Sequence, residues 1–253
     1  MKIGAQLFTV REFTKTLDDL ALTLKKVADI GYTVVQLSGT CAYPAEWMDE
    51  QLKKNGLICA ITHTNGDRIT NETDKVIAEH KVFGCPIIGI GSSPVSLDND
   101  SGFNEFVTRF LLAANRIKEA GLLFAYHNHN HEFSKLNGVT IMEALLDAFP
   151  ADVMTFTLDT YWIQAGGGDS AQWIREFTGR VHNVHLKDMT IAGGHEQRMA
   201  PIGGGNMNFP AILNACADSG TRYLLVEQDD CYGDNPFDCL AQSYNYLKAQ
   251  GLN

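Results

Sequence analysis

Eight short apolar runs, separated by longer amphipathic stretches, are the feature of this sequence that most restricts its fold. The runs are apolar at nearly every position, which is typical of strands buried on both faces in a parallel sheet. They cover residues 2–7, 33–38, 57–63, 86–91, 122–127, 152–158, 181–187 and 223–228. The pattern predicts a sheet of eight parallel strands.

The stretches between the runs have the spacing of amphipathic helices. Apolar residues at helical spacing begin at Leu17, and the stretch ends at Gly31, a residue favoured after a helix C-terminus. Two later stretches end in the same way, at Gly121 and Gly220. Eight strand-then-helix units of roughly 32 residues match a (β/α)₈ barrel in number and size. We therefore predict one α/β TIM-barrel domain over residues 1–253.

An open doubly wound sheet is the alternative fold. It usually has fewer strands, and it needs a glycine-rich phosphate-binding turn after the first strand. The first predicted strand instead leads into "LFTVRE", which has no such turn. The barrel is the better interpretation.

Composition excludes several classes of protein. The formal net charge is −10, which disfavours binding to nucleic acid or to an anionic membrane, because phosphates would be repelled. No apolar run approaches the roughly 18 residues that span a bilayer, and the N-terminal stretch lacks the features of a signal peptide. The six cysteines are scattered without a CxxC pair, as expected of buried free thiols in a reducing compartment. We expect a cytoplasmic protein.

Ionisable side chains gather at the C-terminal ends of the predicted strands. This is the edge at which TIM barrels carry their catalytic groups. A buried strand has no structural use for such a group unless the group is paired or bound to a metal. The residues concerned include His63, His127, Asp159, His185, Lys187 and Glu227. Their joint occurrence predicts an active site at this end of the barrel.

A subset of these residues has the composition of a divalent-metal site. Glu132, Asp159, His185 and Glu227 offer three carboxylates and one imidazole, which suit Mn²⁺, Mg²⁺ or Co²⁺, with Zn²⁺ and Fe²⁺ also compatible. Carboxylates held together without a cation would repel one another.

The other histidines are expected to play lesser parts. His127, His129 and His131 cannot all point the same way along an alternating strand, and His131 is the one expected not to take part in the site. His182 and His195 are expected to be structural or exposed.

Four motifs carry a family resemblance. In chain order, "YHNHNHEF", "LDTYWIQAGG", "VHLKDM" and "PIGGGNMNF" resemble the sugar phosphate isomerase/epimerase-like family. This is the xylose isomerase-like TIM-barrel group, which also includes inosose dehydratases, ketose 3-epimerases and endonuclease IV. The resemblance extends from about residue 2 to about residue 248, and it is specific for the group rather than for a substrate.

The resemblance implies a site with one divalent metal. Glu132, Asp159, His185 and Glu227 would hold the ion, with Glu132 and Glu227 as the acid/base pair on opposite faces of a sugar. The metal would polarise the substrate oxygens and stabilise an enediolate. The glycine loop at residues 200–207 would close over the substrate. The expected substrate-binding residues are His63, His127, His129, Trp162, Lys187, Arg198, Gly203 and Gly204.

The sequence departs from the family pattern at two positions. Epimerases of the family end strand five in a glutamate, where this chain has His127, and Glu132 follows five residues later. We expect Glu132 to be the ligand, with His127 as the alternative. Members with a more elaborate site carry a histidine three residues after the aspartate, where this chain has Trp162. This difference, together with the acidic charge, argues against endonuclease activity.

The predicted function is a metal-dependent sugar isomerase or epimerase. A lyase or dehydratase that acts on a keto-inositol or a 3-keto-glycoside would use the same chemistry and is the first alternative. A non-catalytic sugar-binding accessory subunit is the second. Few basic residues accompany the glycine loop, which favours an unphosphorylated sugar. A homo-oligomer is compatible with the sequence, but no segment indicates an interface.

Overall fold

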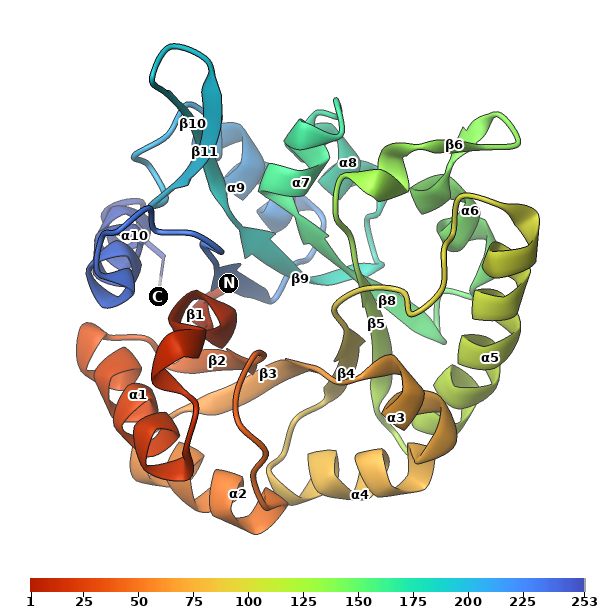
Figure 1. The fold of residues 1–253 in the computed structure, drawn as a ribbon, viewed down its shortest axis with the longest axis horizontal. Coiled ribbons are helices and arrows are strands. Elements are labelled where there is room, and N and C mark those ends of the chain that lie inside the picture. The colour runs from red at the N-terminus through yellow and green to blue at the C-terminus, as the bar shows by residue number, and fades with distance from the viewer. Residues whose placement is uncertain (253) are drawn as a thin grey trace.

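The computed structural model describes residues 1–252, in which eight parallel strands close into a barrel (Figure 1). In barrel order the strands are β1 (Lys2–Gln6), β12 (Tyr223–Val226), β9 (Val181–Leu186), β8 (Met154–Asp159), β5 (Leu123–His127), β4 (Ile87–Ile90), β3 (Ile58–His63) and β2 (Val34–Leu37). Seven of the predicted runs contain one of these strands, and the run 152–158 contains all of β8 except its last residue, Asp159. The predicted (β/α)₈ barrel is confirmed.

Helices follow the strands and surround the barrel (Figure 1). The first helix, α1, is capped at its N-terminus by Thr16, whose side chain accepts a hydrogen bond from the Asp19 amide. It ends before Gly31, whose φ of 120° is unfavourable for residues other than glycine. The helices are α1 (Leu17–Ile30), α2 (Ala45–Lys54), α3 (Gly66–Asn71), α4 (Thr73–Val82), α5 (Asp100–Glu119), α6 (Ile141–Ala148), α7 (Thr160–Ala165), α8 (Ser170–Glu176), α9 (Phe209–Asp218) and α10 (Pro236–Ala249).

Short elements lie in the loops at the C-terminal ends of the strands. A 3₁₀ helix, η1 (Leu7–Phe13), follows β1, and a second, η2 (His131–Phe133), follows β5. Two antiparallel hairpins add to this rim. They are β6 (Lys135–Leu136) with β7 (Val139–Thr140), and β10 (Asp188–Ala192) with β11 (Glu196–Ala200). The β10–β11 hairpin projects away from the barrel in Figure 1.

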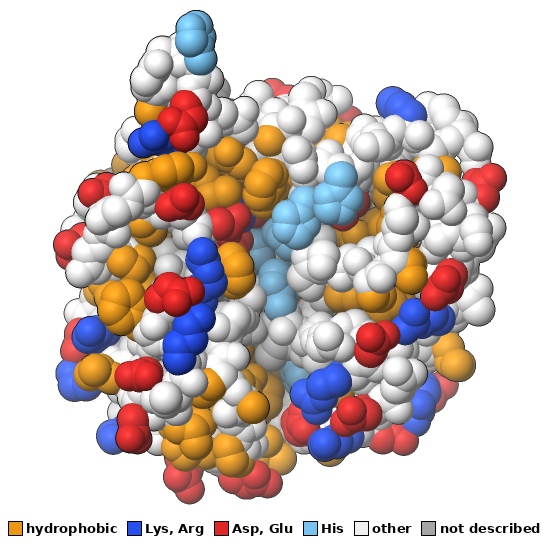
Figure 2. Space-filling view, in the orientation of Figure 1, with side chains coloured by type: hydrophobic (Ala, Val, Ile, Leu, Met, Phe, Trp, Pro, Cys, Tyr) orange, Lys and Arg blue, Asp and Glu red, His pale blue; other side chains and the backbone are white. Residues whose placement is uncertain are grey.

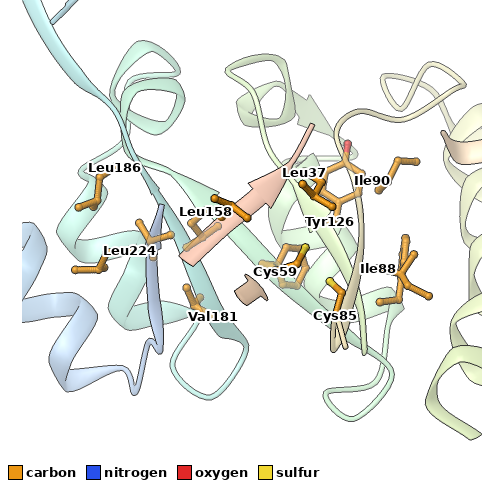
Figure 3. Packing of buried hydrophobic residues seen from close by; sticks show 14 of the residues in the cluster. Leu37, Cys59, Cys85, Ile88, Ile90, Tyr126, Leu158, Val181, Leu186 and Leu224 are labelled. Carbon is orange, nitrogen blue, oxygen red and sulfur yellow. The ribbon is translucent and has the colours of Figure 1, made fainter. Parts of the chain in front are cut away.

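Alternation along the strands separates two hydrophobic cores. Outward-facing residues such as Leu158 and Leu224 pack against the helices, and Figure 3 shows part of this layer, including Tyr126. A small cluster fills the barrel interior and consists of Val34, Ala60, Ile61, Ile87, Ala125 and Leu225. At the C-terminal ends of the strands, polar side chains replace the apolar ones of this inner cluster.

The six cysteines are free thiols, as expected from their spacing. Cys41 and Cys231 are half-buried, and the other four are buried. Among residues 1–252, no helix combines the length and the apolar character needed to cross a membrane.

Candidate functional site

Three ionisable side chains meet where β8, β9 and β12 end. Asp159 is the last residue of β8, His185 lies near the end of β9, and Glu227 follows β12 directly. Each offers one ligand atom, and these atoms lie within 4.8 Å of one another. All three side chains are buried. The structure therefore brings together three of the four predicted metal ligands.

Each carboxylate in this group has one oxygen held by the protein and one that faces its neighbours. The Oδ1 atom of Asp159 accepts a hydrogen bond of 3.0 Å from the Trp162 amide and so caps α7. The Oε1 atom of Glu227 accepts a bond of 2.7 Å from the Gln6 side chain. The opposite oxygens, Oδ2 and Oε2, have no hydrogen-bond partner. The two carboxylates are thus fixed in orientation, and each turns its second oxygen towards the centre of the group.

The imidazole of His185 is oriented in the same manner. Its Nε2 atom lies 2.6 Å from the Oε1 atom of Gln36, which can only accept, so Nε2 carries the hydrogen. Its Nδ1 atom has no hydrogen-bond partner and lies 2.9 Å from Oε2 of Glu227 and 3.7 Å from Oδ2 of Asp159. A buried imidazole with one nitrogen fixed and the other turned towards two carboxylates is an arrangement typical of metal-binding histidines.

Lys187 places a positive charge beside this group. Its side chain is 1% exposed, and its Nζ atom lies 3.0 Å from Oδ2 of Asp159 and 3.0 Å from Oε2 of Glu227. Asp229, which the sequence analysis missed, lies 3.0 Å from the same ammonium through each of its oxygens. The available signal was spacing, because Asp229 follows Glu227 by two residues and an extended chain places both on one side.

The charges in the cluster shift one another's pKa values. Burial opposes the charged form of His185, but the carboxylates of Glu227 and Asp159 outweigh it and raise its pKa to about 9. Burial also opposes ionisation of Glu227, but Lys187 and His185 hold its pKa well below the usual range. Burial and the Glu227 charge raise the pKa of Asp229 to about 7. Strong perturbation of this kind is typical of functional sites.

Glu132 lies elsewhere, contrary to the expectation from sequence. It sits in η2, where its carboxylate accepts hydrogen bonds of 2.6 Å from the Tyr126 hydroxyl and 2.8 Å from the His129 amide. The His131 Nε2 atom lies 3.0 Å from the same carboxylate. Tyr126 points outward from the barrel, towards Phe106 of α5. The structure therefore brings Glu132 together with His129 and His131 and not with the other three predicted ligands.

His127 occupies the inward position at the end of β5. Its ring centroid lies 4.5 Å from that of His185 and 5.1 Å from that of His63. Its Nδ1 atom is buried without a hydrogen-bond partner. Burial, together with His185, holds its pKa well below the ordinary value, so the imidazole is neutral at pH 7. The alternative ligand at strand five is thus the residue that the fold turns towards the centre.

A pocket of about 300 Å³ opens over these residues. His63, His127, His129, Lys187, Glu227 and Asp229 line it. Figure 2 shows histidine side chains gathered in the central hollow of this face. The Trp162 ring lies beside it, with its centroid 5.5 Å from that of His129 and from the Lys187 ammonium.

Three predicted substrate-binding residues lie away from this pocket lining. Arg198 is on β11, where it pairs with Glu196 and lies over the Tyr232 ring. Gly203 and Gly204 belong to the glycine loop, which is held by a neighbouring side chain. The Asp188 carboxylate accepts hydrogen bonds from the amides of Gly203, Gly205 and Met207. In the structure the loop wraps a buried aspartate at the base of the β10–β11 hairpin.

Comparison with known proteins gives the family. The model of the xylose isomerase-like TIM barrel matches residues 24–250. An inosose dehydratase of Clostridium perfringens is 22% identical in an alignment of 211 residues, with a coverage of 70% of this chain and 70% of the relative. A crystal structure of a sugar phosphate isomerase/epimerase from Parabacteroides distasonis has a TM-score of 0.81 at 23% identity, over 98% of this chain and 93% of the other.

An L-ribulose 3-epimerase structure is also similar, with a TM-score of 0.76 at 16% identity, over 98% of this chain and 94% of the other. These likenesses agree with the closed barrel. The chain belongs to the xylose isomerase-like TIM barrel family.

Proposed function

We propose that this protein is a divalent-metal-dependent enzyme that moves a proton at the carbon next to a carbonyl group in a sugar, as an isomerase or epimerase. One observation carries the proposal. Asp159, His185 and Glu227 each have one polar atom fixed by a protein partner and a second atom turned towards the other two residues, where its near neighbours are one another and the Lys187 ammonium. Three buried donor atoms that converge in this way, from two carboxylates and an imidazole, fit a cation site.

The donor set also fits the chemistry of such a cation. Two carboxylate oxygens and an imidazole nitrogen suit Mn²⁺, Mg²⁺ or Co²⁺, and also accept Zn²⁺ or Fe²⁺. We propose Asp159, His185 and Glu227 as metal ligands. His127 takes the place of Glu132 as the ligand expected at the end of strand β5. When bound, the ion would polarise the substrate carbonyl and so acidify the neighbouring C–H bond.

Glu227 is the proposed base. Its carboxylate lines the pocket and is charged at neutral pH, because Lys187 and His185 hold its pKa low despite burial. The hydrogen bond from Gln6 fixes its orientation. His127, on a strand separated from β12 by β8 and β9, supplies a neutral imidazole from another side of the opening. Proton removal by Glu227 and proton exchange through His127 would give isomerisation or epimerisation.

The side chains in and beside the pocket support a neutral, polyhydroxylated substrate. His63 Nε2, His127 Nδ1 and Trp162 Nε1 are buried hydrogen-bonding atoms without a partner, and they suit sugar hydroxyl groups. Burial and the His185 charge lower the pKa of His63 to about 3, so its ring is neutral. Among the described residues, Lys187 is the one lysine or arginine that lines this pocket, and three carboxylates already surround it. We propose an unphosphorylated sugar.

Proton exchange with solvent tests this function. The metal-free protein would be reloaded with Mn²⁺ and incubated in D₂O with ketoses, aldoses and their phosphate esters, and deuterium uptake followed by NMR. We expect deuterium at the carbon next to the carbonyl of an uncharged sugar, and loss of exchange in Glu227→Gln. Exchange that is unchanged in this variant would contradict the assignment of the base, and turnover of esters alone would overturn the substrate class.

A lyase is the second candidate, and the placement of Glu132 favours it. An epimerase of this family uses glutamates on opposite faces of the sugar, whereas Glu227 is the one glutamate that lines this pocket among the described residues. An elimination requires one base and a group that protonates the departing hydroxyl. The Clostridium perfringens relative is an inosose dehydratase by name. Incubation with keto-inositols and 3-keto-glycosides separates the two candidates, because only a lyase releases water or an aglycone.

A further inference from the structure

Asp229 contacts Lys187 more extensively than does any other carboxylate in the cluster. Both of its oxygens lie 3.0 Å from the ammonium, whereas Asp159 and Glu227 each contribute one oxygen at that distance. Asp229 is also the most accessible member, with 24% of its side chain exposed compared with 1% for Lys187. It therefore approaches the ammonium from the pocket, on the solvent side.

The cluster has a charge that matches a divalent cation. With His185 neutral, as a metal ligand must be, Asp159, Glu227 and Asp229 carry three negative charges when ionised and Lys187 carries one positive charge, which leaves two negative charges. Two uncompensated charges in a buried site are costly, and one divalent ion balances them.

Lys187 nevertheless competes with such an ion. Its ammonium contacts Oδ2 of Asp159 and Oε2 of Glu227, which are the two oxygens proposed as metal ligands. Because the ammonium lies 3.0 Å from both oxygens, it must shift towards another partner when a cation binds them. The carboxylate of Asp229, on the solvent side, is the partner that remains for it.

We propose that Asp229 is a positioning residue that keeps a partner for the Lys187 ammonium on the solvent side of the site when a divalent cation takes the oxygens of Asp159 and Glu227. The inference rests on the proposed metal site. It assigns to Asp229 an effect on metal affinity that acts through Lys187 rather than by coordination.

Calorimetric titration with Mn²⁺ tests this role on the full chain. Asp229→Asn should weaken Mn²⁺ binding by roughly 10–100-fold, the effect typical of residues that orient a metal site. Asp230→Asn is the matched control, because this neighbouring carboxylate accepts a hydrogen bond from the Tyr232 amide instead, and it should bind Mn²⁺ like the parent. Lys187→Met removes the competing charge while retaining most of the side-chain length, and it should bind at least as tightly as the parent.

The double variant distinguishes an indirect role from a direct one. With Lys187→Met present, Asp229→Asn should cost at least tenfold less affinity than it does in the parent. An equal loss in both backgrounds, or no loss from Asp229→Asn alone, would overturn the inference. Circular dichroism of each variant establishes that it is folded.

A measurement without metal separates this inference from the proposed function. In ¹⁵N-lysine NMR of the metal-free protein, the Lys187 ammonium signal should shift in Asp229→Asn and stay unchanged in Asp230→Asn. An unchanged signal in both variants would overturn the positioning role even if Lys187→Met does not fold. A parent protein that binds no Mn²⁺ would instead overturn the proposed metal site, and with it the effect of Asp229 on affinity.

Discussion

Two buried carboxylates, Glu227 and Glu132, occupy opposite kinds of environment. Glu227 lies inside the barrel mouth, where one oxygen is bonded to Gln6 and the other has no hydrogen bond. Glu132 lies in η2, beyond the end of β5, where both oxygens accept hydrogen bonds, from Tyr126 and from the His129 amide. The second oxygen of Glu227 instead lies beside the charged groups of Lys187 and His185. The difference supports the proposal that Glu227 serves the site and that Glu132 stabilises the fold around η2.

The same contrast separates two buried histidines. His185 faces carboxylates, which raise its pKa to about 9. His80 of α4 has neutral partners on both nitrogens, namely the Val76 carbonyl at 2.7 Å and the Thr62 hydroxyl at 2.8 Å. Burial alone is therefore a poor guide to function, and the state of the second polar atom is a better one.

Substitution of Glu227 should have the largest effect on activity. We expect Glu227→Gln to reduce turnover of any substrate by roughly 10²–10⁴-fold, the usual contribution of a general base, while the protein stays folded. The control is Glu196→Gln on the exposed hairpin, which should retain parent activity. Steady-state kinetics and circular dichroism measure the two properties. Equal activity in the two variants would contradict a catalytic role for Glu227.

His80 should make stability depend on pH. Burial lowers its pKa to about 4, with Arg68 adding to the effect and Val76 and Glu79 opposing it. The unfolded chain, with an ordinary pKa near 6.5, binds the proton first as the pH falls. The stability is therefore complete above about pH 6.5 and decreases towards pH 4, by roughly 3 kcal/mol.

Urea unfolding of the parent and of His80→Gln between pH 4 and 7 measures this dependence. The difference in unfolding free energy between the two proteins should shrink as the pH falls. A difference that stays constant over this range would show that His80 titrates normally in the folded protein.

Substitution of Glu132 should have a smaller effect, on stability rather than on metal binding. Glu132→Gln replaces an acceptor oxygen by a donor, which leaves the Tyr126 hydroxyl or the His129 amide without its partner. We expect a loss of about 2 kcal/mol of unfolding free energy, the usual cost of an unsatisfied buried group. Glu143→Gln, in the capping box of α6, provides a comparison at an accessible carboxylate and should cost less. Equal losses would argue against a special structural role for Glu132.

The sequence predicted the barrel and three of the converging residues for a common reason. Two-sided burial makes each strand apolar along its length, so a polar residue at its end is conspicuous, as with Asp159 and Glu227. The direction of Glu132 was not predictable, because it depends on the turn after β5 and on a bond to Tyr126, which faces outward. The contact between Lys187 and Asp229 joins residues 42 positions apart that follow two neighbouring strands, β9 and β12, and no local pattern signals the contact.

Metal analysis of the parent, Glu132→Gln and Glu227→Gln tests the proposed difference between Glu132 and Glu227 most directly. Each protein would be stripped with a chelator, reloaded with Mn²⁺, desalted and analysed for metal per chain. We predict one Mn²⁺ per chain in the parent and in Glu132→Gln, and a large loss of metal in Glu227→Gln. Loss of the metal in Glu132→Gln, with retention in Glu227→Gln, would contradict the division between a structural and a functional carboxylate.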